Sequence, residues 1–295
     1  MYYLGCPMWA NARWQGSLYQ QGSSDRYLAQ YCRFFNSVEG NTTFYADPTA
    51  ETVLRWANQI NQAVASSATQ SFCFNAKVPK RISHLGEGTT ALRTWLELLA
   101  PLQPHIGFIH LQLPASFKPS QLPTLAPLLE MIRQQYACAV EIRHPAFFDK
   151  AQQEQALHQL LREYQAERLC LDSRALFSVS PTTTELIDAQ QKKPRLPVHV
   201  KALTQKPTFR FIGLDDMAAN RHFYQPWLHK MQEWLAEGYQ PTAFFHTPDN
   251  RLAPQLARQF ALDLLALGGP AHQVLQPWPA QPEAEAESQL SLFGG

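Results

Sequence analysis

The stretch Ala139-Val140-Glu141-Ile142-Arg143-His144-Pro145 decides the fold, because it is a short apolar strand that ends in three functional side chains. Side chains alternate between the faces of a strand, so Glu141 and Arg143 share one face and His144 lies on the other. Pro145 ends the strand at that point. Charged groups at the carboxyl end of a strand are typical of a functional site, and the alternative is an ion pair buried in a barrel interior.

The same pattern repeats along the chain, where short apolar strands alternate with amphipathic helices. We predict strands at residues 2–5, 37–41, 72–77, 106–112, 138–143, 168–172, 209–213 and 242–246. We predict helices at residues 25–35, 49–65, 90–102, 121–135, 152–164, 220–237 and 249–267. Eight such units predict an α/β fold, a (β/α)8 barrel of TIM type, as a single domain over residues 1–267. Residues 173–207 hold four prolines and no sustained helical period, which predicts an irregular excursion.

Net charge, cysteine content and missing motifs argue against several classes of protein. The 295 residues include 25 Lys and Arg and 24 Asp and Glu, which gives a net charge of +1. A chain with this charge has no strong electric field to attract polyanions. The five cysteines are spread without a CxxC pair, which indicates reduced thiols and a cytoplasmic location. The sequence shows no signal-peptide pattern and no apolar run long enough to span a membrane, so we expect no association with a membrane. The absence of GxGxxG, P-loop and GxSxG motifs argues against dinucleotide binding, P-loop hydrolysis and serine-hydrolase chemistry.

Polar side chains follow the ends of several predicted strands, where the loops of a barrel form its functional face. Glu141 or Asp172 is the candidate general base, and His144 or His246 the candidate proton-transfer group near neutral pH. Substrate contacts are predicted from the remaining polar and aromatic residues around that face, with Lys77 and Arg143 as the anion-binding pair. These predicted contacts are Trp9, Asn41, Tyr45, Lys77, Gln112, Arg143 and Arg210.

A divalent metal ion is a weaker alternative for the same face. Glu141, His144, Asp172 and His246 are suitable ligand types, but no HExxH or paired His-x-His motif supports such a site. Loop aromatics such as Trp9 and Tyr45 could stack on a planar ring or pack over the barrel mouth. The cofactor therefore stays undetermined from the sequence.

Four motifs in order resemble the DUF72 family, also called YecE-like. They comprise residues 35–45 (FNSVEGNTTFY), 74–80 (FNAKVPK), 111–117 (LQLPASF) and 140–145 (VEIRHP). The resemblance spans about residues 1–267 and implies a barrel of TIM type, while the activity of the family is not established. The chain departs from the family pattern at Ile212-Gly213, where members often carry a His-Gly pair.

A second signal lies at the C-terminus. Residues 268–288 are rich in Pro, Ala, Gln and Glu, which predicts a disordered linker. Residues 289–295 follow, and Gln289-Leu290-Ser291-Leu292-Phe293 resembles the peptide motif that binds the bacterial DNA sliding clamp. In that motif Gln289 would bind the pocket rim, and Leu290, Leu292 and Phe293 would enter apolar sub-sites. The alternative is a tail that folds back on the barrel.

Three functions fit these features. The first is an enzyme on an anionic, phosphate-containing or nucleic-acid substrate, recruited to DNA by the clamp motif and concerned with repair or phosphodiester chemistry. The second is an enzyme, a hydrolase or lyase, on a small sugar or phosphate, with an incidental tail. The third is a non-catalytic protein that binds a ligand in its pocket.

Overall fold

The protein is described here by a computed structural model covering residues 1–20, 24–66, 71–84 and 86–279. Its strands are β1 (Tyr3–Gly5), β2 (Ser37–Gly40), β3 (Cys73–Ala76), β4 (Ile109–Gln112), β5 (Cys138–Glu141), β6 (Glu167–Asp172), β7 (Thr208–Ile212) and β8 (Thr242–His246). Its α-helices are α1 (Tyr27–Phe34), α2 (Thr42–Tyr45), α3 (Ala50–Ala65), α4 (Lys80–Ser83), α5 (Gly88–Leu98), α6 (Ala126–Arg133), α7 (Gln152–Glu163), α8 (Thr184–Lys192), α9 (Met217–Ala236) and α10 (Ala253–Ala266).

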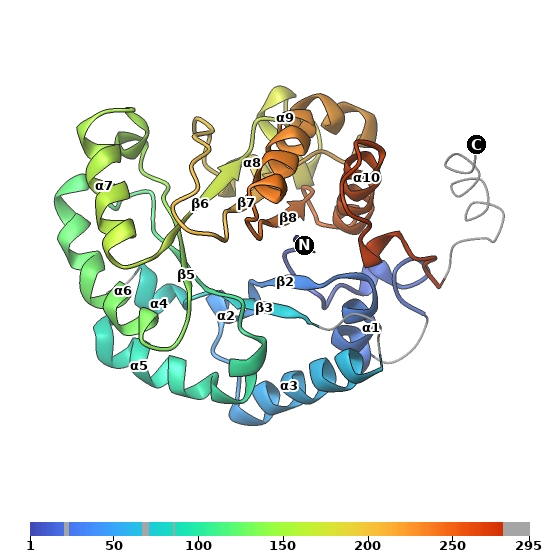
Figure 1. Ribbon diagram of the computed structural model, residues 1–295, viewed down its shortest axis with the longest axis horizontal. Helices are drawn as coiled ribbons and strands as arrows, with labels where there is room; N and C mark the ends of the chain where they lie inside the picture. Colours follow the sequence, from blue (N-terminus) through green and yellow to red (C-terminus); the bar gives the residue numbers. More distant parts are fainter. Residues whose placement is uncertain (21–23, 67–70, 85, 280–295) are drawn as a thin grey trace.

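The predicted strands are confirmed, and every strand pairing in the described residues is parallel. Figure 1 shows the strands at the centre, with helices around them.

The strands do not form one closed ladder, so the prediction of a closed eight-stranded barrel is wrong. Six strands form a curled sheet in the order β1-β8-β7-β6-β5-β4, and β2 pairs with β3 as a separate sheet. The edges of the two sheets lie next to each other at two places, β1 beside β2 and β3 beside β4, which we call the seams. The fold is therefore a mixed α/β structure built on a parallel half-barrel.

Side-chain amides supplement a few backbone hydrogen bonds at both seams. Asn36 accepts a hydrogen bond from Leu4 N (2.8 Å) and donates one to Tyr2 O (2.9 Å), which ties the start of β2 to β1. Asn75 accepts from the backbone N–H of Phe108 (3.1 Å) at the other seam. At the β3–β4 seam the backbone pairing is limited to isolated bridges at Phe74 and Lys77.

Glycines permit the close approach of the chains at these seams. A Cβ on Gly5 would lie 2.3 Å from the carbonyl oxygen of Ser37. A Cβ on Gly107, just before β4, would lie 2.5 Å from the amide oxygen of Asn75. Any larger residue at either position would push the two sheets apart.

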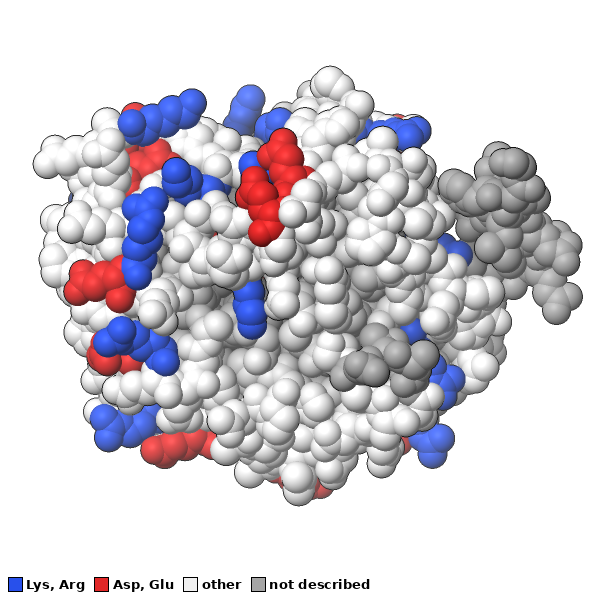
Figure 2. Space-filling model, in the orientation of Figure 1, with Lys and Arg blue, Asp and Glu red and all other residues white. Residues whose placement is uncertain are grey.

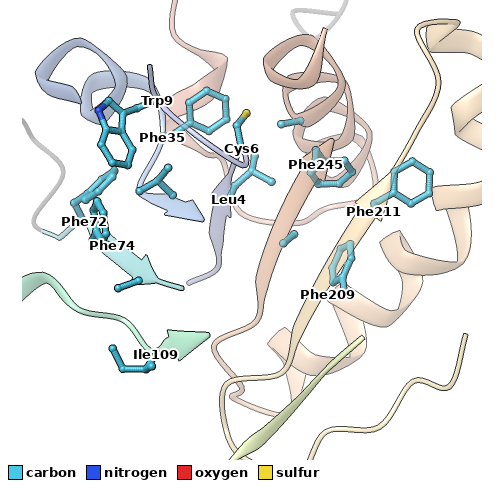
Figure 3. Packing of buried hydrophobic residues seen from close by; sticks show 14 of the residues in the cluster. Leu4, Cys6, Trp9, Phe35, Phe72, Phe74, Ile109, Phe209, Phe211 and Phe245 are labelled. Atoms are coloured by element: carbon cyan, nitrogen blue, oxygen red, sulfur yellow. The ribbon is translucent and has the colours of Figure 1, made fainter. Parts of the chain in front are cut away.

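The outer face of the half-barrel holds the main apolar core. Phe209 and Phe211 point away from the barrel interior, and Phe209 stacks on Trp227 of α9 with ring centroids 4.1 Å apart. Figure 3 shows Phe209 and Phe211 of β7 near Phe245 of β8. Since outward positions are apolar, the intervening inward positions, such as Arg210, are free to be polar. Helix α3 follows the same logic, because Thr49 caps it and its apolar positions recur every three or four residues.

The segment 173–207 contains helix α8, so the expectation of a wholly irregular excursion is corrected. Thr183 caps α8 by accepting a hydrogen bond from Leu186 N (3.2 Å). Ala189 of α8 packs with Leu171 of β6 and Ile212 of β7, which lie at the carboxyl ends of their strands. The excursion therefore covers part of the barrel mouth with apolar contacts.

The chain beyond α10 stays attached to the body as far as residue 279. The ring of His272 lies 2.9 Å from the amide oxygen of Asn36, and the indole of Trp278 covers Arg258 of α10 at 5.1 Å. The rest of the predicted linker and the clamp-like residues Gln289–Phe293 lie outside the described residues. Within the described part, no helix combines the length and the apolar character needed to cross a membrane.

Candidate functional site

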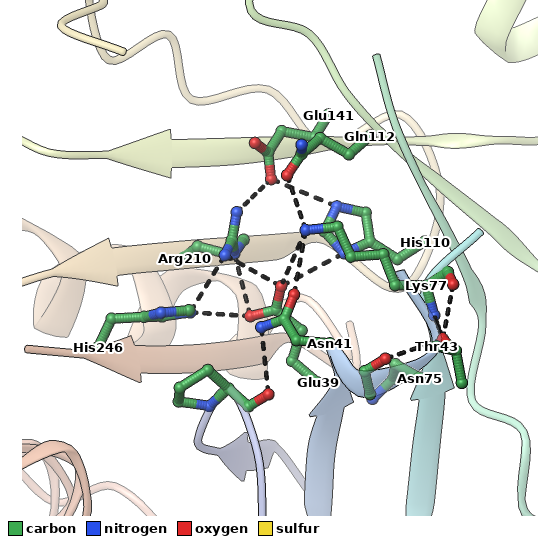
Figure 4. A network of polar contacts seen from close by, with 12 residues as sticks. Glu39, Asn41, Thr43, Asn75, Lys77, His110, Gln112, Glu141, Arg210 and His246 are labelled. Atoms are coloured by element: carbon green, nitrogen blue, oxygen red, sulfur yellow. Dashed lines mark hydrogen bonds and ion pairs between the residues drawn. The ribbon is translucent and has the colours of Figure 1, made fainter. Parts of the chain in front are cut away.

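Arg210 lies at the centre of a buried polar cluster inside the half-barrel (Figure 4). Its guanidinium donates hydrogen bonds to Glu39 (Nε to Oε2, 3.1 Å) and to Glu141 (Nη1 to Oε2, 2.5 Å), and its Nη2 forms an ion pair with Oε1 of Glu39 at 3.0 Å. Burial alone would raise the pKa of each carboxyl group. The positive charges outweigh this effect, with Arg210 at Glu39 and Arg143 and Arg210 at Glu141, and hold both pKa values well below their usual range. Both carboxylates are therefore fixed negative charges.

His110 lies between the same two carboxylates. Its Nδ1 is 3.5 Å from Oε1 of Glu39 and its Nε2 is 3.3 Å from Oε2 of Glu141. Neither ring nitrogen makes a hydrogen bond of normal geometry within the described residues. The sequence analysis missed His110, although strand alternation places it on the same face as Gln112, two residues later.

Lys77 follows β3 and reaches the mouth side of the cluster. Its Nζ donates to Gln112 (2.7 Å) and Asn41 (3.0 Å), and lies 4.0 Å from Glu39. Burial, and then the charge of Arg210, lower the pKa of Lys77 well below its ordinary value. The lowered pKa eases release of its proton, so Lys77 is a candidate proton-transfer group.

A threonine positions Lys77. The Thr43 hydroxyl on α2 accepts a hydrogen bond from Lys77 N (3.0 Å) and donates to Lys77 O (2.6 Å). Asn41 at the start of the same turn also donates to Pro7 O (3.1 Å), so β2, β3 and the first loop meet here. The motif at residues 41–45 therefore shapes the mouth.

Arg143 extends from the cluster toward solvent. Its Nε donates to Glu141 (2.6 Å) and its Nη2 to Gln112 (2.7 Å). The side chain is 13% exposed, and its Nη1 makes no hydrogen bond within the described residues. Glu141 and Arg143 thus form the ion pair of the alternative reading, and the functional role of the stretch stays a prediction.

His246 ends β8 beside Glu39, with 2.8 Å between its Nε2 and Oε2 of the carboxylate. Burial and the charge of Arg210 lower the pKa of His246 to about 3. The ring is therefore neutral at pH 7 and donates a hydrogen bond to Glu39.

Lys193, directly after α8, adds a further cation that the sequence analysis missed. Burial and the charges of Arg210 and Arg143 lower its pKa to about 7. Only the path of the excursion brings it to the cluster, so no local pattern in the sequence could have identified it.

Other predicted site residues lie apart from this cluster. Asp172 points outward, where it accepts from Trp227 Nε1 (2.7 Å) and forms an ion pair with Arg174 (2.8 Å). His144 uses its Nδ1 to accept from Ala146 N (3.2 Å) and so caps the following turn. Their proposed roles stay predictions, and the cluster does not include them.

The two predicted loop aromatics also differ in environment. Trp9 is buried and meets Trp56 edge-on, with centroids 5.1 Å apart. Tyr45 is 80% exposed and contacts Phe44 (5.1 Å). Trp9 thus contributes to packing, and Tyr45 is accessible at the mouth beside Asn41. No group of three or more His, Cys, Asp and Glu side chains in the described ranges is arranged to hold a metal ion.

Comparisons with known proteins agree with this architecture. The family model described as "Protein of unknown function DUF72" matches residues 3–283. The UPF0759 protein YecE of Escherichia coli K12 is 40% identical over 267 residues, covering 90% of this chain and 93% of the relative, and that of strain O157:H7 is 39% identical over the same coverage.

Solved structures show the same fold. A DUF72 family protein from Enterococcus faecalis V583 has a TM-score of 0.66 at 16% identity, covering 90% of this chain and 96% of that one. A DUF72 family protein from Thermotoga maritima MSB8 has a TM-score of 0.61 at 20% identity, covering 90% and 99%. The chain belongs to the DUF72 family.

Proposed function

We propose that the protein is an enzyme that acts on an anionic, phosphate-containing substrate at the mouth of the half-barrel. The observation that carries this proposal is the charge balance of the cluster, in which basic side chains outnumber carboxylates. The basic members are Lys77, Arg143, Lys193 and Arg210, and the carboxylates are Glu39 and Glu141. Arg143 and Arg210 balance the two carboxylates, and an anion at the mouth would favour the protonated forms of Lys77 and Lys193, whose pKa values are otherwise lowered.

The surplus is local to the mouth. Over the face in Figure 2, acidic and basic side chains are interspersed along the flank formed by α5 to α7, and much of the remaining face is uncharged. The chain as a whole carries +1. A small anionic group that enters the mouth therefore fits the charges better than broad adhesion to a polyanion does.

Arg143 is the proposed anion contact, because its Nη1 is available while its other bonds fix the guanidinium. Lys193 is the proposed second contact. Lys77 is the proposed proton-transfer group. Glu141 is a poor base because its charge is stabilised by Arg210 and Arg143, so we assign it the role of positioning Arg143.

Calorimetry with inorganic phosphate tests the binding step. Arg143→Gln and Lys193→Ala should each weaken binding at least about tenfold, since each removes a charge-assisted contact. Lys192→Ala is the matched control, because Lys192 is exposed and pairs with Asp188 (2.6 Å). Equal affinity in all three variants would contradict the assignment.

Turnover assays separate an enzyme from a binding protein. Substrates should include a phosphomonoester, a phosphodiester and nicked, abasic and single-stranded DNA, each with Lys77→Met as the inactive comparison. Phosphate binding without turnover on any of these would favour a ligand-binding protein, which is the alternative.

We also propose recruitment to the bacterial sliding clamp through Gln289, Leu290, Leu292 and Phe293, supported by the sequence motif alone. Removal of residues 289–295 should abolish clamp binding by the full-length protein in a pull-down with purified clamp. Ser291→Ala is the control, because the motif tolerates a small residue there. Binding that survives the deletion, or no binding by the intact chain, would reject recruitment.

A further inference from the structure

A cavity of about 610 Å³ lies beside the polar cluster, at the carboxyl ends of β3 and β4. One side is formed by α4, the turn after it and the start of α5. The other is formed by the loop after β4, the 3₁₀ helix η4 (Pro119–Leu125) and α6. The volume is in the range of cavities that hold a small organic ligand.

The lining of this cavity carries no Asp, Glu, Lys or Arg side chain. It includes His84, Leu113, Ser116, Phe117 and Thr124. Apolar groups such as Leu113 and Phe117 are combined with neutral hydroxyl and amide groups. This chemistry suits an uncharged ring or hydrocarbon with a few polar substituents, and it contrasts with the charged cluster next to it.

Direct contacts join the cavity to the cluster. Lys77 Nζ lies 4.5 Å from the ring centroid of Phe44, and the ring of Phe44 meets that of His84 at 5.3 Å. His84 in turn lines the cavity. Burial, and then the charges of Arg143 and Lys77, lower the pKa of His84 to about 4, as expected of a neutral ring at the border between the two regions.

The β4 side provides a second connection. Gln112 accepts hydrogen bonds from Lys77 and Arg143, and the next residue, Leu113, enters the cavity wall. The backbone N–H of Leu113 donates to Glu141 O (2.9 Å), so the wall is held to β5. Phe117 is fixed by stacking on Phe147 with centroids 6.2 Å apart.

The opposite wall is also braced. Arg81 of α4 binds Asp47 (Nη2 to Oδ2, 2.6 Å) and also pairs with Glu87. Gly88, which begins α5, has φ +80, a conformation that disfavours other residues. The cavity is therefore preformed between two supported walls rather than created by a ligand.

We propose that the substrate is an organic anion whose uncharged ring occupies this cavity while its anionic group reaches Arg143. This inference rests on the proposed function and adds the substrate class: an aryl or similar ring-bearing phosphate, in preference to phosphate itself or a small aliphatic phosphate. The cluster recognises the charge, and the cavity supplies the selectivity for the ring.

Calorimetry with phenyl phosphate, methyl phosphate and inorganic phosphate tests the assignment. Phenyl phosphate should bind the full-length protein at least about tenfold more tightly than methyl phosphate, because the ring leaves water for the cavity. Ser116→Trp and Thr124→Trp, both at exposed positions on the cavity edge, should remove that advantage and leave inorganic phosphate binding unchanged. Thr94→Trp, at an exposed position of α5 outside the lining, is the control and should keep it.

The outcomes distinguish the two proposals. Phosphate binding with no preference for phenyl phosphate would overturn the cavity assignment and leave the proposed function intact. A preference that survives in both filling variants would also overturn it. Failure of all three ligands to bind would reject the proposed function, and the inference with it.

Discussion

Arg210 Nη1 lies 2.5 Å from Oε2 of Glu141, and both side chains are almost completely excluded from solvent. The same guanidinium also pairs with Glu39, so Arg210 joins two buried carboxylates, and Arg143 is a second partner of Glu141. The whole inner layer of the half-barrel depends on this pairing.

Replacing Arg210 with methionine should therefore destabilise the fold by about 3–5 kcal/mol, because it removes the main cation beside buried Glu39 and leaves Glu141 with Arg143 alone. Urea unfolding followed by circular dichroism measures the change. Arg55→Ala, on an exposed face of α3, should stay within about 0.5 kcal/mol of the parent. A small effect at Arg210 would mean that the carboxylates are compensated elsewhere.

The free energy of unfolding should fall as the pH decreases from about 6.5 toward 3, partly through His272. Burial lowers the pKa of His272 from 6.5 to about 3. The unfolded chain therefore binds a proton that the folded chain rejects, so the stability from this group is complete above pH 6.5 and is lost below it. Proton gain at Nδ1 would break its hydrogen bond from Val274 N (3.0 Å).

His272→Gln should flatten this pH dependence, measured as unfolding free energy at pH steps between 4 and 7. Val274→Ala is the control, because it creates a cavity in the same segment without removing a titrating group. That variant should lose stability equally at every pH. An unchanged slope in His272→Gln would assign the acid sensitivity to other groups.

Asn36→Asp should destabilise the protein by about 3 kcal/mol or more. The change removes the donor to Tyr2 O and places a charge where the side chain is buried. Thermal unfolding measures the loss. Asn61→Asp, exposed on α3, is the matched substitution and should have little effect. Similar melting temperatures for both variants would show that the β1–β2 seam does not depend on the amide.

Lys193 should react with a limiting amount of acetic anhydride at pH 7.5 in preference to its neighbour Lys192. A pKa of about 7 leaves much of Lys193 as the nucleophilic amine. The pKa of Lys192 is raised by its hydrogen bond to Asp188. Peptide mass spectrometry gives the ratio of acetylation at the two sites between pH 6 and 9. A higher yield at Lys192 throughout that range would contradict the pKa order.

Polar residues within or just after apolar strands meet in the cluster where their side chains point inward. Lys77, Gln112, Glu141 and Arg210 do so (Figure 4), while their catalytic and binding roles stay predictions. Asp172 also ends a strand, but it lies on the face of β6 that carries Arg168, which binds Glu154 of α7, and this face points to the surrounding helices. The position of a residue along a strand therefore does not tell on which face of the strand its side chain lies.

Long-range features were beyond the sequence pattern. The strand order around the half-barrel follows from β/α alternation, whereas the open seams depend on Asn36 and Asn75 crossing between chains. In the sequence alone, a polar residue beside a strand indicates only a loop. Lys193 is similar, because the fold of α8 over the mouth, rather than any motif, brings it to Arg210 and Arg143.

The attachment of Trp278 to Arg258 gives the C-terminal tail a fixed origin on the flank of α10 (Figure 1). Ten residues separate positions 279 and 289, and a fully extended chain spans at most about 3.5 Å per residue. A partner that binds Gln289 would therefore lie within about 35 Å of residue 279. Any such assembly would hold the half-barrel in a restricted zone around its partner.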